Sequence, residues 1–382
     1  MTKKYDYIVA GAGAAGLSLI IHLIESGKFK DKKILLVDRV QKNLNDRTWC
    51  FWESSHGIFE SIVYKRWQKL WFYSNWYSSL NNIGPYTYKL IRGIDFYNYC
   101  FKIIREQVNI DIQYGEVQSC FSDKHETGIV LNGENIFADY VFNSIQFEQP
   151  KAEKRYQYLL QHFKGSFIQT EEKIFNPSEA TLMDFRVDQQ HGTTFVYVMP
   201  FSSTEALVEY TIFSPAVLGQ DEYDKGIKEY CNNHLKLSRY NILSEEFGVI
   251  PMTDHPFRSA QHHIINIGTA GGQTKASSGY TFQFIQKNSA AIAGALITTG
   301  APFFKTSVLS KRHAWFDSVL LNILAKNKMS GEKIFSLFMK RNTLNEVLKF
   351  LDNETSMMEE LKIISPLPKL IFSKAALQTF FR

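Results

Sequence analysis

Cysteine is scarce in this sequence, and its placement is not that of a disulfide framework or a zinc site. Four cysteines occur in 382 residues, and no two are spaced as CxxC. This argues against a disulfide-stapled secreted fold and favours a reduced intracellular compartment. No set of cysteines and histidines has zinc-site spacing, so no metal centre is predicted. The sequence also lacks the GxSxG elbow and the Walker phosphate loop.

Long hydrophobic runs are missing as well. The longest uncharged apolar stretches, Ile8–Ile24 and Asn288–Phe304, contain Gly, Ser or Thr and fall short of the ~20 apolar residues that a spanning helix requires. Lys3 and Lys4 precede an apolar run, as in a signal peptide. However, Asp6 interrupts that run and glycines punctuate it, which favours a strand and a glycine loop.

The charge balance is close to neutral over most of the chain. The net charge is +5, from 43 Lys/Arg and 38 Asp/Glu. Residues 301–382 hold 13 Lys/Arg and 7 Asp/Glu, a balance of +6, so residues 1–300 sum to −1. Apolar spacing predicts that this basic region is helical. It can face an anionic membrane or be a solvated helical surface. No nucleic-acid partner is predicted, because this mild excess is its sole support.

The end of that region combines basic and aromatic residues. Leu367–Arg382 reads LPKLIFSKAALQTFFR and mixes lysines with leucines and phenylalanines. A helix of this kind can lie in a membrane interface, or it can pack on the protein body.

The beginning of the chain carries a glycine motif in a βαβ context. Gly11–Gly16 reads GAGAAG and stands between a strand-like run, Tyr5–Ala10, and a helical run, Leu17–Ser26; a buried-strand pattern follows over Lys33–Asp38. The glycines allow a tight turn and close approach of a pyrophosphate, and an acid at the end of the second strand can accept hydrogen bonds from ribose hydroxyls. The residues predicted to bind the dinucleotide are Gly11, Ala12, Gly13, Ala14, Ala15, Gly16 and Asp38.

A second glycine-rich element favours FAD over NAD as that dinucleotide. Ile264–Gly268 reads as a strand, and GTAGG begins at its last residue and precedes a helix over roughly Gln283–Leu296. In FAD-binding Rossmann enzymes a late strand, loop and helix close over the flavin and its pyrophosphate. Gly268, Gly271 and Gly272 are therefore added to the predicted FAD contacts.

The middle of the chain has the alternating pattern of an antiparallel sheet between Lys164 and about Phe213. The predicted fold is α/β: an FAD-binding Rossmann-type domain, an inserted antiparallel β-sheet substrate domain and a C-terminal helical region. The expected boundaries are 1–70, 95–150 and 255–300 for the discontinuous FAD domain, 71–94 and 151–254 for the substrate domain, and 301–382 for the basic helical region.

Several strings give the chain a resemblance to a known family. Asp46–Glu53 reads DRTWCFWE, Leu207–Thr211 reads LVEYT and Ser277–Phe282 reads SSGYTF. Together with GAGAAG, these look like the bacterial and plant-type lycopene β-cyclases, over most of residues 5–320. Further matches are Tyr88–Arg92, Leu182–Val187, Val198–Ser202, Gly248–Thr253 and Arg312–Asp317.

The resemblance implies an activity, its cofactors and a location. The family holds FAD non-covalently, uses it reduced with NAD(P)H as the electron source, and converts the ψ ends of lycopene into β rings, through γ-carotene to β-carotene, without net redox change. It works at the membrane that holds its substrate. We therefore expect a cytoplasmic protein peripherally associated with the inner face of the cell membrane.

The family's chemistry needs a positioned acid, and Glu209 in LVEYT is the candidate. Plant members carry two consecutive acids at this motif, whereas Tyr210 stands at the second position here. Strand alternation places Leu207, Glu209 and Thr211 on one face, and an apolar pocket would raise the pKa of the carboxyl so that it stays protonated. Reduced flavin is the rival for the proton transfer and for stabilising the cation.

The DRTWCFWE and SSGYTF strings supply candidate pocket residues. Aromatic rings can stabilise a cation through their faces or serve as plain apolar lining, and Glu53 can be a second acid or base or a structural partner. The candidates for the substrate or flavin pocket are Arg47, Trp49, Phe51, Trp52, Glu53 and Tyr280.

Two other functions stay open at this stage. One is a redox flavoenzyme of the same architecture, such as a polyprenoid reductase or a hydroxylase, which would consume NAD(P)H in proportion to product. The other is a non-catalytic flavin- or nucleotide-binding protein, which would bind FAD and leave lycopene unchanged.

Overall fold

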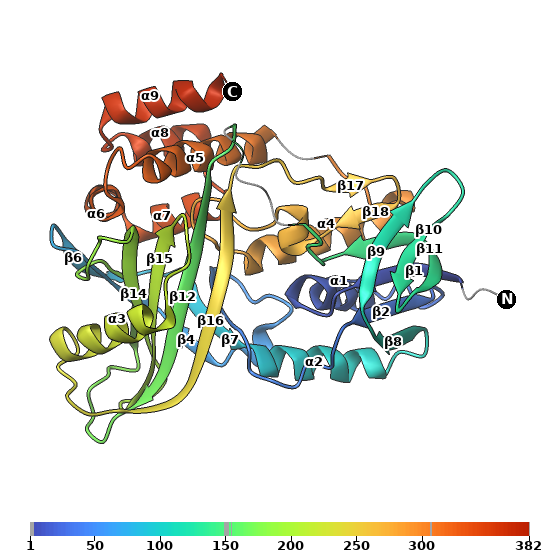
Figure 1. The fold of residues 1–382 in the computed structure, drawn as a ribbon, viewed down its shortest axis with the longest axis horizontal. Helices are drawn as coiled ribbons and strands as arrows, with labels where there is room; N and C mark the ends of the chain where they lie inside the picture. The colour runs from blue at the N-terminus through green and yellow to red at the C-terminus, as the bar shows by residue number, and fades with distance from the viewer. Residues whose placement is uncertain (1–3, 149–152, 154, 306–307, 382) are drawn as a thin grey trace.

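The computed structural model describes residues 4–148, 153, 155–305 and 308–381 (Figure 1). Its first sheet is of the Rossmann type and lies at one end of the molecule. Five parallel strands run in the order β18-β11-β1-β2-β8, and the β9–β10 hairpin extends β11 antiparallel. These strands are β1 (Lys4–Ala10), β2 (Ile34–Asp38), β8 (Ile110–Tyr114), β9 (Val117–Ser122), β10 (Thr127–Leu131), β11 (Glu134–Asn143) and β18 (Ile264–Asn266), with the short β17 (Ala260–Gln261) beside β18.

Helices cover the faces of this sheet. Because the central strands are buried on both faces, their sequences are nearly continuous apolar runs. α1 packs against both α2 and α4. The three helices are α1 (Ala14–Glu25), α2 (Gly93–Arg105) and α4 (Phe282–Thr299).

The second sheet has seven strands and lies toward the other end of the molecule (Figure 1). Its strands in order are β16 (Asn241–Thr253), β12 (Tyr158–Gln169), β15 (Glu205–Ser214), β14 (Thr193–Pro200), β13 (Glu179–Asp184), β5 (Lys69–Tyr73) and β6 (Ser78–Asn82). Side chains alternate between its faces. One face packs against α3 (Gln220–Asn233), and the other faces the C-terminal helices and the Rossmann-type part.

A small third sheet stands between these two. It has the order β3-β7-β4, formed by β3 (Thr48–Glu53), β7 (Thr87–Arg92) and β4 (Lys65–Trp67). Of two short 3₁₀ turns, η1 (Glu60–Ile62) lies against α2 and η2 (Gly268–Gly271) lies against α1 and β18.

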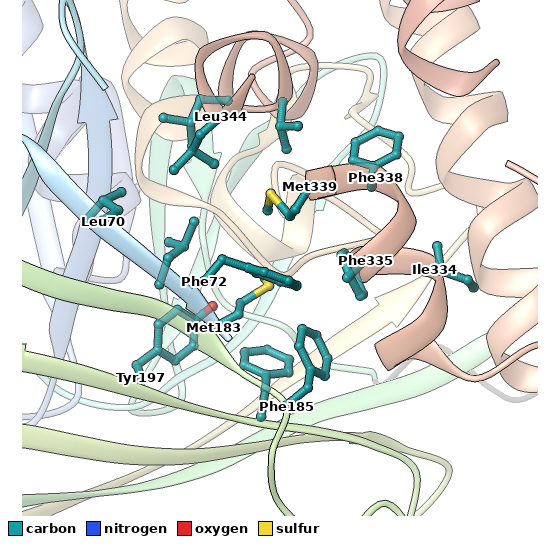
Figure 2. Close-up of a cluster of buried hydrophobic side chains, with 14 of the residues drawn as sticks. Leu70, Phe72, Met183, Phe185, Tyr197, Ile334, Phe335, Phe338, Met339 and Leu344 are labelled. Atoms are coloured by element: carbon teal, nitrogen blue, oxygen red, sulfur yellow. The ribbon is translucent and has the colours of Figure 1, made fainter. Parts of the chain in front are cut away.

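The C-terminal helices are held on the seven-stranded sheet by a large apolar core. Figure 2 shows Phe335 and Met339 of α6 (Gly331–Arg341) on the side of the helix that faces Phe72 and Phe185 of the sheet region. The rings of Phe185 and Phe335 stack with centroids 5.5 Å apart. Burial of such large side chains contributes roughly 1.5–3 kcal/mol each, which fixes the helices against the sheet. The helices are α5 (Val308–Ala325), α6 (Gly331–Arg341), α7 (Leu344–Leu351), α8 (Met357–Ile364) and α9 (Lys369–Phe380).

The α/β fold class predicted from the sequence is confirmed. The strand at Tyr5–Ala10, the helix after the glycine loop and the helix near Gln283 all appear within a few residues of their expected bounds. The sequence patterns did not predict the elements within residues 40–100, where the structure has β3 to β7 and the beginning of α2. The domain boundaries stay a prediction; in the fold, β5 and β6 join the seven-stranded sheet, and β7 belongs to the third sheet.

Candidate active site

One cleft joins the glycine loop to the seven-stranded sheet. It has a volume of about 770 Å³, and Gly13 of the loop and Glu209 of β15 both line it. Between them, β3 contributes Trp49, and the segment before α4 contributes Tyr280. The cleft therefore combines a phosphate-binding type of loop with a carboxyl group and aromatic rings.

The glycine loop has the geometry that a pyrophosphate needs. Gly13 precedes the first turn of α1, and among the described residues no heavy atom lies within 4 Å of the place a Cβ would take there. A Cβ on Gly16 would lie 2.0 Å from the carbonyl oxygen of Gly11, so a side chain cannot be accommodated. The backbone N–H groups at the start of α1 are thus open to an anion, and the helix dipole favours negative charge there.

The second glycine element meets this loop directly. Gly268 lines the cleft, has a φ of +62°, and a Cβ on it would lie 2.7 Å from the Cβ of Ala15. Gly271 and Gly272 lie in the turn behind it, where a Cβ on Gly271 would meet the carbonyl oxygen of Asn266 at 2.2 Å. Gly268 thus lines the cleft beside the first glycine loop, whereas Gly271 and Gly272 shape the turn that carries it. The predicted contacts of these three glycines with FAD stay a prediction.

Asp38 contacts the backbone of the glycine loop. Its Oδ2 accepts a hydrogen bond of 2.7 Å from the N–H of Ala12, and its Oδ1 lies 3.4 Å from Nζ of Lys42. The carboxylate therefore links the end of β2 to the glycine loop. Its predicted contact with ribose hydroxyls stays a prediction.

Glu209 occupies the middle of β15 and faces the cleft. Its Oε1 accepts a hydrogen bond of 2.9 Å from Oγ1 of Thr211, and Leu207 lines the cleft on the same face. Burial is the main cause that raises its pKa, to about 8; the negative charge of Glu246 raises it further and the hydrogen bond from Thr211 opposes the shift. The carboxyl therefore holds its proton at neutral pH, as an acid catalyst must.

Tyr210 lies on the opposite face of the sheet. Its ring sits 2.7 Å from the place of a Cβ on Gly226 in α3. Because successive side chains of a strand alternate, a residue at position 210 cannot share the cleft with Glu209.

The sequence analysis missed a second carboxyl group, which belongs to another strand. Glu246 of β16 is 7% exposed, and its Oε2 accepts a hydrogen bond of 2.7 Å from Oγ1 of Thr48. Burial raises its pKa to about 7, while the hydrogen bond from Thr48 and the positive charge of Arg47 hold the shift down. The residue stands two positions before the GVIPMT string, but its proximity to position 209 depends on strand pairing that the pattern does not specify.

The predicted pocket residues divide into two groups. Arg47, Trp49 and Tyr280 line the cleft. Phe51 packs behind it, stacked on Phe282 with centroids 4.6 Å apart, and Trp52 is 2% exposed and meets Tyr280 edge-on.

Glu53 is engaged in an ion pair. Its Oε1 lies 2.6 Å from Nζ of buried Lys89, which also contacts Glu60. Its Oε2 accepts a hydrogen bond of 3.2 Å from the side chain of Gln283. This is the structural pairing that the sequence left as one alternative for Glu53.

Two tyrosines that the sequence did not single out also line the cleft. The hydroxyl oxygens of Tyr197 and Tyr280 lie 3.5 Å apart, and Tyr88 is 1% exposed beside them. Burial raises the pKa of all three phenols, so they stay neutral and present ring faces and hydroxyl groups to a ligand.

In the described part of the chain, no group of three or more His, Cys, Asp or Glu side chains is arranged to hold a metal ion.

The family model described as lycopene cyclase protein matches residues 6–377. The chain belongs to this family. One curated relative is a lycopene beta-cyclase of Pantoea ananas, which is 26% identical to this chain in an alignment that covers 66% of this chain and 64% of that protein. A chloroplastic neoxanthin synthase of Solanum tuberosum is 24% identical over 72% of this chain and 57% of its own length. The chain thus spans less than two thirds of these relatives.

Solved structures show the fold of this lycopene cyclase family member to be that of FAD-dependent oxidoreductases. A geranylgeranyl bacteriochlorophyll reductase-like protein of Thermoplasma acidophilum has a TM-score of 0.68 at 13% identity and covers 98% of this chain and 99% of its own. The flavin-dependent brominase Bmp2 has a TM-score of 0.64 at 14% identity, with 92% and 94% covered. At these identities the likeness concerns the fold alone.

Proposed function

We propose that this family member is a lycopene β-cyclase that converts the ψ end groups of lycopene, through γ-carotene, into the β rings of β-carotene. The observation that carries the proposal is a protonated carboxyl, Glu209, facing an aromatic cleft that it shares with a phosphate-binding type of glycine loop. An alkene has no polar handle, so an enzyme must protonate it with a neutral acid held against an apolar surface.

The residues of the cleft suit each stage of such a reaction. Glu209 gives its proton to the terminal double bond, which leaves a tertiary carbocation. A neighbouring double bond of the same chain attacks that carbon and closes the ring, and a proton is then lost to a base. The faces of Trp49 and Tyr280 can stabilise the positive charge while it exists. Product and substrate are isomers, because one proton enters and one leaves.

The proposed cofactor is FAD, with NAD(P)H as the source of its electrons. Gly13, Ala14, Ala15 and Gly268 would hold its pyrophosphate, since they line the cleft where the start of α1 is open to an anion. When bound and reduced, FAD would supply negative charge opposite the developing cation.

The test is expression in a lycopene-accumulating host followed by pigment chromatography. We expect β-carotene or γ-carotene from the wild type and unchanged lycopene from Glu209→Gln. Glu205→Gln is the matched control, because Glu205 lies on the same strand and pairs with Gln169 away from the cleft. Cyclisation by Glu209→Gln at the wild-type rate would remove this acid from the mechanism.

The mass of the isolated pigment, together with NAD(P)H consumption by the purified protein, distinguishes the cyclase from a redox flavoenzyme of this fold. A reductase or hydroxylase would consume NAD(P)H in proportion to product, and its product would differ from lycopene in mass. A cyclase leaves the pigment mass unchanged and uses NAD(P)H only to bring the flavin to its reduced state.

We also propose that the protein binds the inner face of the cell membrane from the cytoplasm through α9. Ala375 of α9 is buried in the core near α5, whereas Leu370, Phe380 and Phe381 are 82%, 70% and 79% exposed. α9 is the outermost helix of the C-terminal region (Figure 1). None of the helices in the described ranges combines the length and hydropathy needed to span a bilayer. An apolar face flanked by lysines suits an anionic lipid surface.

Vesicle flotation tests this second proposal. We expect binding to vesicles with anionic lipid and its loss when Leu370, Phe380 and Phe381 are all changed to serine. Val108→Ser is the control, because Val108 is a fully exposed apolar residue just beyond α2. Equal flotation of wild type and triple variant would reject α9 as the membrane contact.

A further inference from the structure

Four residues form a continuous row across the seven-stranded sheet. Tyr197 of β14 is paired with Glu209 of β15, Glu209 with Gly165 of β12, and Gly165 with Glu246 of β16. Residues that are directly paired in antiparallel strands point to the same face of the sheet. All four positions of the row are therefore on the face that lines the cleft.

The glycine in the row makes room between the two carboxyl groups. A Cβ on Gly165 would lie 2.9 Å from Cδ1 of Leu207 and 3.1 Å from Cγ of Glu246. The stem of Glu246 thus lies over the place that a side chain at position 165 would take. The negative charge of Glu246 acts on Glu209 across this gap, although their strands are not adjacent.

The two carboxyl groups have different partners. Glu246 is fixed by the hydroxyl of Thr48 at 2.7 Å and is influenced by the positive charge of Arg47. Glu209 accepts a hydrogen bond from Thr211 and faces the cleft. Each carboxyl accepts one hydrogen bond from a threonine, so the positive charge of Arg47 is what distinguishes them. Because a nearby cation favours the charged form, a single negative charge on the pair resides preferentially on Glu246.

We propose that Glu246 is the positioning residue that carries the negative charge of the carboxyl pair and thereby keeps the transferable proton on Glu209. The proposal deepens the cyclase function proposed above and rests on it. The aspartic-protease type of pairing, in which two nearby carboxyls share one proton, is the general physical precedent. Here the second carboxyl comes from β16 rather than from position 210.

Other titratable or charged groups also face the pair, and they do not reverse this assignment. Arg47 lowers the pKa of Glu246, and Asp46 raises it. The neutral phenols and the neutral thiol around Glu209 carry no charge near pH 7, because burial raises their pKa values above the ordinary range. These groups are Tyr88, Tyr197, Tyr280 and Cys50.

The rate of cyclisation should depend on pH in a way that reveals the charge of Glu246. Cyclisation needs protonated Glu209, so its rate falls as the pH rises through the pKa of Glu209. Removing the negative charge of Glu246 lowers that pKa. The alkaline limb of the rate profile in Glu246→Gln should therefore move to lower pH by roughly one unit, within the range of like-charge effects.

The test compares pH–rate profiles of the FAD-loaded protein on lycopene in vesicles. Glu246→Gln should show the shifted limb, and Glu246→Asp, which retains the charge, should restore the limb toward its wild-type position. Glu245→Gln is the matched control: Glu245 is the neighbouring residue on β16 and pairs with Lys164 at 3.0 Å on the opposite face. A lower rate with an unmoved limb in Glu246→Gln would reduce Glu246 to a structural role and overturn the proposal.

A second measurement keeps the two proposals apart. Infrared titration of the carboxyl C=O band in the FAD-loaded protein, without lycopene, reads the pair directly. The band is read above pH 7, because burial also raises the pKa of Asp352 and of Glu246 to about 7. We expect a protonated carboxyl that persists above pH 7 in the wild type, is lost there in Glu209→Gln and titrates at lower pH in Glu246→Gln. Persistence of that band in Glu209→Gln would overturn the proposal even if Glu246→Gln did not fold. Failure of the wild type to cyclise lycopene, with this titration intact, would instead reject the proposed function.

Discussion

Replacing Glu209 by glutamine should increase the free energy of unfolding relative to the wild type. This gain should be larger at alkaline pH than at acidic pH. The folded state raises the pKa of this carboxyl from 4.5 to about 8. Between these values the unfolded chain loses the proton and the folded chain keeps it. Wild-type stability therefore falls as the pH rises through this window, whereas glutamine has no proton to lose.

The size of the effect follows from the same shift. At about 1.4 kcal/mol per pKa unit, the upper bound is about 5 kcal/mol. Glu209 faces a cleft that admits solvent, and part of the shift belongs to Glu246, so we expect on the order of 2 kcal/mol.

The assay is urea unfolding at pH 4, 6 and 9 with the same free FAD concentration for every variant. The difference in unfolding free energy between Glu209→Gln and wild type should grow from pH 4 to pH 9. Glu245→Gln should show no such growth, because the Glu245 side chain is 41% exposed and buried Lys164 keeps its second partner, Asp224. A Glu209→Gln difference that stays constant from pH 4 to pH 9 would refute the claim that this carboxyl is held neutral by its surroundings.

Three further substitutions test the loop, the ion pair behind the cleft and a helix. Gly13→Ala places a methyl group in the open space where a pyrophosphate would lie, so FAD affinity in a fluorescence titration should fall about tenfold or more while the fold persists; unchanged affinity would exclude this loop as the phosphate site. Lys89→Met leaves the carboxylates of Glu53 and Glu60 without their buried cation and should cost about 3 kcal/mol in urea unfolding, with wild-type stability as the contradicting result. Gly294→Ala in α4 meets no described atom within 4 Å of the new methyl group and should raise stability by about 0.5–1 kcal/mol, measured by thermal unfolding; destabilisation would contradict the open space there.

The sequence by itself determined the local elements of this protein. The glycine spacing of residues 11–16 specifies a turn that few other residue types can form, because a Cβ at Gly16 would strike the Gly11 carbonyl. Continuous apolar runs indicated the buried parallel strands, and alternating runs indicated antiparallel strands between Lys164 and Phe213. Alternation also places Glu209 with Leu207 on the face that lines the cleft, and the family motif made Glu209 the candidate acid.

Only the tertiary structure decided which distant residues meet. DRTWCFWE contains three candidate aromatic rings, and the pairing of β3 with β7 places Trp49 in the cleft while Phe51 packs behind it. Glu246 is separated from Glu209 by 37 positions in the chain and by the intervening β12 in the sheet. Periodicity records which face of an element is buried but not which strand becomes its neighbour or in which register. The second carboxyl group, Glu246 beside the cleft, is therefore a product of long-range strand pairing, which no local pattern in this sequence specifies.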